Sequence, residues 1–183
     1  LNCGNTREKI RVCGLLCSCI VADTNCRNVV ARNVDKMRLL NLLQKEELES
    51  RRNAFLLLTE LICLYRRKDA NFFLKGLHKD NIVKAMHDLQ TYLQDCPREQ
   101  KIMVAVLLLH FDLLADTDMP NAYRDDAVDV ITLGLESSLS DERSREMCCK
   151  VLLILGGHFS FSGKIMTEDW ILRQAGFLEG FGV

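Results

Sequence analysis

The sequence predicts an all-α fold, a right-handed superhelical solenoid, because its leucine-rich segments recur at a nearly constant step. A shift of 46 residues aligns Leu15–Cys17 with Leu61–Cys63, and aligns Leu61–Cys63 with Leu107–Leu109. A further shift of 45 residues reaches Leu152–Ile154. Self-similarity at about 40 to 47 residues is typical of armadillo and HEAT arrays, whose repeats bury their apolar faces against one another. We therefore expect the first leucine of each of the last three segments to be buried at the same position of successive long helices. These leucines are Leu61, Leu107 and Leu152.

Weaker helices between these segments keep the same spacing. Two further sets of apolar positions align at steps of 46 residues: Leu39, Ala85 and Ile131 in one set, and Leu43, Leu89 and Leu135 in the other. Each unit therefore contains a short helix, an amphipathic helix and a strongly apolar helix. Three helices per unit favour armadillo-like repeats over two-helix HEAT units.

Five helices are predicted in the first part of the chain. Residues 6–22 place one apolar stripe at helical spacing, formed by Ile10, Cys13, Leu16, Cys17 and Ile20. A short helix is expected after Asp23, followed by an amphipathic helix over 35–47. Residues 49–67 are apolar over most of the helical circumference, which indicates burial on several sides. Another short helix is predicted through Phe72, Phe73 and Leu77.

The same order of helices continues in the second part. The predicted ranges are 81–95, 97–115, 123–139, 141–156 and 167–175. Pro97 suits the first position of a helix because the missing N–H has no intrahelical partner there. Thr167 is the expected N-cap of the last helix, and Gly176 is its expected stop.

These helices divide the chain into about four repeats, of which the first and last are incomplete. The approximate boundaries are 1–33, 34–79, 80–122 and 123–176, with a C-terminal tail over 177–183. The chain begins Leu-Asn-Cys-Gly, so we expect it to be a piece of a longer protein.

Composition excludes some classes of partner and favours an intracellular setting. With 24 basic and 25 acidic residues, the formal charge is −1, which gives no electrostatic footprint for nucleic acid. The longest apolar run, 102–109, is too short to cross a bilayer. Most of the nine cysteines lie within apolar helical stretches, so they are interpreted as reduced core residues. We expect a cytoplasmic protein, with nuclear or membrane association only through partners.

Three local patterns suggest chemistry, and each has a simpler structural interpretation. The stretch 157–164 has the wrong glycine spacing for a phosphate loop, and Ile165 replaces the required Ser or Thr. Cys13, Cys17 and Cys19 do not share one helical face, and structural zinc needs four convergent ligands. His110 lies among leucines, where a histidine is usually part of the core. The sequence therefore predicts no catalytic residue, no metal site and no cofactor.

Arginines recur at the step of the repeat. Arg52 aligns with Arg98 at 46 residues, and Arg98 aligns with Arg143 at 45 residues. Each lies near the start of a predicted strongly apolar helix, and such helices line the concave groove of an armadillo array. Arginine is suited to bidentate recognition of carboxylate and phosphate. These three residues are the candidate protein-binding site, for an acidic or phosphorylated segment of a partner.

The C-terminal half carries a resemblance to a known family. Ser140–Lys150, Leu152–Phe161 and Ile171–Phe177, together with Arg7–Cys13, resemble the armadillo region of plant Cerberus-type ubiquitin ligases, also called Lumpy infections. The resemblance implies a parent protein with a U-box, armadillo-like repeats and WD40 repeats that acts in root infection by rhizobia and mycorrhizal fungi. This chain contains no U-box-like stretch and no WD-type blade, so no catalytic residue is implied for it.

The sequence therefore predicts a protein-interaction scaffold, most consistent with the partner-binding armadillo segment of such a U-box E3 ubiquitin ligase. The ends of an excised stack expose apolar surface, so self-association through them is expected. Two alternatives remain open. One is a general armadillo or HEAT adaptor in assembly or trafficking without ligase activity. The other is a small helical enzyme that uses a cysteine and His110.

Overall fold

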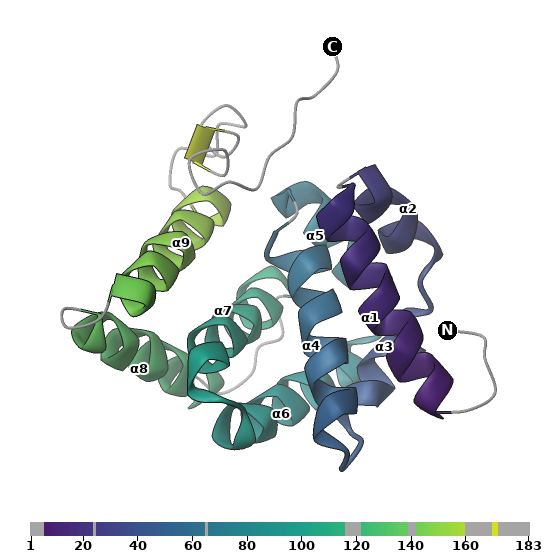
Figure 1. Ribbon diagram of the computed structural model, residues 1–183, viewed down its shortest axis with the longest axis horizontal. Coiled ribbons are helices and arrows are strands. Elements are labelled where there is room, and N and C mark those ends of the chain that lie inside the picture. Colours follow the sequence, from purple (N-terminus) through teal and green to yellow (C-terminus); the bar gives the residue numbers. More distant parts are fainter. Residues whose placement is uncertain are drawn as a thin grey trace.

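The computed structural model describes residues 6–23, 25–64, 66–115, 122–138, 142–159 and 170–171. Within these ranges the regular secondary structure is helical (Figure 1). The helices are α1 (Thr6–Ala22), α2 (Asn25–Asn33), α3 (Lys36–Leu43), α4 (Leu48–Ile62), α5 (Arg67–Lys75), α6 (Lys79–Asp95), α7 (Arg98–Ala115), α8 (Ala122–Ser137) and α9 (Glu142–His158). None of the helices in the described ranges combines the length and apolarity that a membrane crossing requires.

The strongly apolar helices pack against one another in chain order. Helix α1 packs on α4, α4 packs on α7, and α7 packs on α9. Figure 1 shows α4 lying between α1 and α7. The amphipathic helices flank this row: α3 packs on α4 and α6, while α6 and α8 pack on α7. Short helix α5 bridges α4 and α7. The arrangement is the armadillo-like stack predicted from the repeat.

One continuous core runs through the stack. On the amphipathic helices, Leu39, Ala85 and Ile131 are buried, as their alignment predicts. Helix α4 is buried on several sides because Ala54, Phe55, Leu57, Leu58, Leu61 and Ile62 surround most of its circumference. Burial of each large apolar side chain contributes roughly 1.5–3 kcal/mol, so the core rather than helix propensity stabilises these short helices.

Two polar contacts hold the shorter helices α2 and α3 in place. The Asp35 side chain caps α3 by accepting a hydrogen bond from the Arg38 backbone N–H over 3.1 Å. Helix α2 is tied to α4 by an ion pair of 2.9 Å between Arg27 Nη2 and Glu60 Oε2, and both side chains are largely buried. Removing either partner would leave a buried charge uncompensated, which is strongly destabilising.

The prediction that Leu61, Leu107 and Leu152 are all buried is correct on α4 and α7 and wrong on α9. Leu61 and Leu107 are fully buried, but Leu152 is 49% exposed and its N-terminal counterpart Leu15 is 64% exposed. On α9 the inward positions are instead Val151 and Ile154. A helix of an end repeat buries only the face that meets its neighbours, so a run of several apolar residues must leave some of them outside.

Several helix boundaries also differ from the sequence prediction. The helix predicted over 49–67 ends earlier, at Ile62, because the chain bends there and Arg66 is the N-cap of α5. The short helix predicted through residues 72–77 is α5, which begins at Arg67. Of the helix predicted over 167–175, the structure describes residues 170–171, which are helical; Thr167, Gly176 and the tail lie outside the described residues.

Candidate protein-binding surface

Two of the three predicted arginines are exposed on adjacent helices. Arg52 lies one turn into α4, and Arg98 is the first residue of α7. Both are exposed, and the helices that carry them pack against each other. Arg143 is the second residue of α9, and its side chain lies outside the described part of the chain. The structure thus places Arg52 and Arg98 on neighbouring members of the row of strongly apolar helices.

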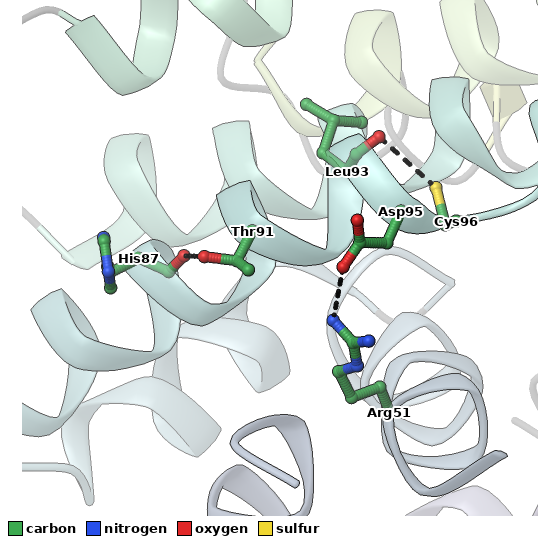
Figure 2. Close-up of polar contacts among 6 residues, drawn as sticks. All are labelled: Arg51, His87, Thr91, Leu93, Asp95 and Cys96. Carbon is green, nitrogen blue, oxygen red and sulfur yellow. Dashed lines mark hydrogen bonds and ion pairs between the residues drawn. The ribbon is translucent and has the colours of Figure 1, made fainter. Parts of the chain in front are cut away.

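The residue beside Arg52 has a different environment. Arg51 Nη1 forms an ion pair of 3.0 Å with Asp95 Oδ2, which joins α4 to the end of α6 (Figure 2). The Arg51 guanidinium also lies 5.7 Å from the ring centroid of Tyr92. It lines a depression of about 300 Å³ that the α3–α4 turn and α6 enclose, with His87 and Thr91 on the α6 side. Arg51 is therefore engaged within the fold, whereas Arg52 is exposed.

Tyr92 of α6 lies where α4, α6 and α7 meet, because its ring centroid is 5.7 Å from that of Phe55 on α4. The Tyr92 hydroxyl donates a hydrogen bond of 2.7 Å to Gln100 Oε1, which links α6 to α7. Burial raises the pKa of Tyr92 to about 12, and the positive charges of Arg52 and Arg51 act in the opposite direction. Both guanidinium groups therefore lie within electrostatic range of the phenol. Exposed side chains of both charges lie at the starts of the two helices: Arg52 and Glu49 on α4, and Arg98 and Glu99 on α7.

The contacts of Arg51 within the fold were not predicted from the sequence, although the helical spacing of α4 indicates that Arg51 points inward. Arg51 is four residues before Phe55, which is buried, and Arg52 is four residues before Leu56, which is 37% exposed. Residues four apart share one side of a helix. The spacing thus indicates that Arg51 points toward the protein interior and Arg52 toward solvent.

His110 is part of a buried histidine pair. Its Nδ1 lies 2.8 Å from the Val106 carbonyl oxygen, and its Nε2 lies 2.7 Å from Nδ1 of His158. A carbonyl can only accept, so Nδ1 of His110 carries a proton; neutral His110 then accepts at Nε2 from the Nδ1–H of His158. The ring of Phe159 packs 5.1 Å from the His110 ring centroid. With both nitrogens bonded and no exposed surface, His110 is placed to join α7 to α9 rather than to act as a general base.

The interpretation of the cysteines as core residues is correct for some of them: Cys13, Cys63 and Cys148 are buried. It is wrong for Cys19 and Cys149, which are exposed because they lie on the outer faces of α1 and α9. Burial raises the pKa of Cys13 to about 11 and that of Cys17 to about 12, and it raises the pKa of Cys63 as well. These thiols therefore stay protonated at neutral pH and are poor nucleophiles. In the described ranges, no group of three or more His, Cys, Asp or Glu side chains is arranged to hold a metal ion.

The packing of the helices defines the class of protein: an armadillo-like helical domain. Comparison with known proteins identifies the family. Residues 1–181 match the family model described as "Putative E3 ubiquitin-protein ligase LIN, ARM-like domain". The chain belongs to this family.

Curated relatives support the assignment. The chain is 35% identical over 164 residues to "Putative E3 ubiquitin-protein ligase LIN-1" and to "LIN-2" of Lotus japonicus, which covers 89% of this chain and 11% of each relative. It is 32% identical over 179 residues to "Putative E3 ubiquitin-protein ligase LIN" of Medicago truncatula, which covers 97% of this chain and 12% of the relative. The chain thus spans about a ninth of the length of these relatives. No solved structure matches the chain.

Proposed function

We propose that this chain holds an acidic or phosphorylated segment of a partner protein on the surface that carries Arg52, Arg98 and Arg143. The observation that supports this proposal is the exposure of Arg52 and Arg98 on packed neighbouring helices at the step of the repeat. A ladder of guanidinium groups along a row of helices suits an extended anionic segment, because each guanidinium can bind one carboxylate or phosphate through two N–H donors.

The free energy of one ion pair is too small to hold a partner, so several contacts are needed. An exposed ion pair contributes only about 0–1 kcal/mol, so one arginine alone does not hold a partner. Micromolar binding corresponds to roughly −8 kcal/mol, which requires several charge-assisted hydrogen bonds together with apolar contacts along the groove. Selectivity then depends on the spacing of acidic groups on the partner.

The parent protein, on this proposal, is a U-box E3 ubiquitin ligase of the cytoplasm that acts in symbiotic root infection. The family membership and the names of the curated relatives support the ligase context. The contribution of this segment is placement: it holds a substrate or regulator while a separate module supports ubiquitin transfer. Tethering in this way raises the effective concentration and fixes the orientation of the bound protein.

A capture experiment tests the proposal. The wild-type chain and the Arg52→Glu/Arg98→Glu/Arg143→Glu variant are immobilised and exposed to root extract, and captured proteins are identified. Loss of an acidic or phosphorylated partner is expected for the variant, with circular dichroism unchanged because exposed Arg52 and Arg98 contribute nothing to the core.

A matched control separates the surface from the change in total charge. The Lys75→Glu/Lys79→Glu/Lys84→Glu variant makes the same charge change at three exposed lysines on α5 and the first part of α6. It should capture the same proteins as wild type. If all three chains capture the same proteins, the arginines do not bind the partner. Ubiquitin conjugation by the isolated chain would contradict the scaffold function.

A further inference from the structure

A second concave surface lies on the short helices, apart from the arginines of α4 and α7. Helices α2 and α5 enclose an open groove of about 480 Å³. Its lining consists of Ala31, Arg32, Lys68, Asp69, Phe72 and Phe73. The groove combines an apolar wall with three charged residues, and two of those three are basic.

Phe72 is the most unusual residue of the groove. Its side chain is 71% exposed, whereas its neighbour Phe73 is buried in the core. Large aromatic residues bury 150–250 Å² when covered, roughly, so an exposed ring in a concave surface is a strong apolar anchor for a ligand. The Phe72 ring therefore offers a contact that the described part of this chain leaves open.

Each wall of the groove carries an exposed cation, and a third cation lies beside the aromatic rings. Arg32 on α2 and Lys68 on α5 are both exposed, and neither forms an ion pair within the described ranges. The Lys36 ammonium lies 5.8 Å from the Phe72 ring centroid and 4.8 Å from that of Phe73. Of the three charged residues that line the groove, two are basic (Arg32 and Lys68) and one is acidic (Asp69). The charge of the groove is complementary to an acidic ligand.

The walls of the groove are held in place by contacts on both sides. The buried Arg27–Glu60 ion pair fixes α2 to α4. Lys36 Nζ donates a hydrogen bond of 2.7 Å to the Phe73 carbonyl oxygen, which fixes α5 to the start of α3. Partial burial lowers the pKa of Lys36 from its ordinary value, which fits an ammonium packed against apolar surface. A ligand thus meets a preorganised surface and loses little affinity to reordering.

We propose that the groove between α2 and α5 is a second docking site, which binds a short acidic–hydrophobic peptide segment of a partner protein. An aromatic or branched aliphatic side chain of the peptide packs on Phe72. Asp or Glu residues beside it pair with Arg32 and Lys68. This site is independent of the arginine surface on α4 and α7, so the two surfaces can hold two parts of one partner or two partners.

Selection from a library of short random peptides displayed on phage tests this site. The wild-type chain is the target, and the Phe72→Ala/Lys68→Glu variant is the counter-target. Enriched peptides should carry Asp or Glu next to an aromatic or branched aliphatic residue. A synthetic enriched peptide should lose at least about tenfold in affinity for the Phe72→Ala chain and for the Lys68→Glu chain, as expected for an anchor residue and its charge partner.

Matched variants make the outcome decisive. Leu133→Ala/Lys84→Glu changes one exposed apolar residue and one exposed lysine on α8 and α6, and it should bind the peptide like wild type. Arg52→Glu/Arg98→Glu should also leave this affinity unchanged, so failure here is distinguishable from failure of the arginine surface. Equal recovery of peptides on wild type and counter-target, or an enriched set without acidic residues, would overturn the proposal.

Discussion

At the residue scale, the His110–His158 pair shows how a polar contact is tolerated in an apolar stack. Both rings are buried, and each hydrogen bond of His110 is directed by one fixed acceptor or donor. A second proton on His110 would place a positive charge in this buried site and would require His158 to change its Nδ1 from donor to acceptor, so the neutral form is favoured. The link between α7 and α9 is therefore sensitive to pH.

The stability of the fold should fall in acid because of this pair. Burial, followed by the charge of His158, lowers the pKa of His110 from 6.5 to about 3. The unfolded chain then binds a proton that the folded chain excludes. Stability is fully present above about pH 6.5 and is lost as the pH falls toward 3, by up to about 1.4 kcal/mol per pH unit. Urea denaturation across this range measures the slope.

Two variants isolate the contribution of His110 from that of the carboxylates. His110→Gln should be less stable than wild type at neutral pH but should show a shallower loss in acid. His87→Gln, at an exposed histidine, should keep the wild-type slope. Parallel pH dependence for wild type and His110→Gln would contradict the assignment.

The arginine pair on α4 shows where prediction from sequence stops. The repeat step selects Arg52 and Arg98, and both are exposed. The ion pair of Arg51 with Asp95 spans 44 residues and depends on how α6 packs against α4, which no local pattern encodes. The groove with Phe72 was missed for the same reason, since its two walls belong to helices far apart in the chain.

At the scale of the helices, periodicity is informative because it is local. The apolar stripe of residues 6–22 predicts α1, and Ile10, Cys13 and Ile20 are buried as expected. Alignment at a fixed step fails where repeats differ in length or lie at an end, as Leu152 shows. There the burial of a residue is decided by the number of neighbouring helices rather than by its own character.

A pair of substitutions tests this corrected register. Leu107→Asp places an unpaired charge in the core of α7, which costs on the order of several kcal/mol and is comparable to the total stability of a small domain. The variant should be largely unfolded by circular dichroism. Leu152→Asp, at the half-exposed equivalent on α9, should melt within a few degrees of wild type. A wild-type melt for Leu107→Asp would contradict the packing of α7.

At the scale of the whole molecule, the stack has apolar surface at its ends. Helix α1 packs closely on α2 and α4, and it carries the exposed residues Leu15 and Val21, which are 64% and 74% exposed. Helix α8 similarly exposes Val128 and Leu133. Repeat arrays need polar capping units, so uncovered ends favour association.

The isolated chain should therefore self-associate with rising concentration, as measured by light scattering. Leu15→Ser/Val21→Ser should reduce the average mass, because it removes apolar surface at one end. Leu48→Ser, at an exposed leucine on α4, should leave the mass unchanged. A monomer at all concentrations, unaffected by deletion of residues 177–183, would contradict the expectation for the ends.

The central claim is that exposed arginines at the step of the repeat hold an anionic partner segment. Isothermal titration of a partner identified by capture, into wild type and into Arg52→Glu/Arg98→Glu, measures this most directly. We expect the variant to lose at least about tenfold in affinity and to show a weaker salt dependence, because exposed ion pairs are screened by salt. Equal affinity and equal salt dependence in the two chains would contradict it.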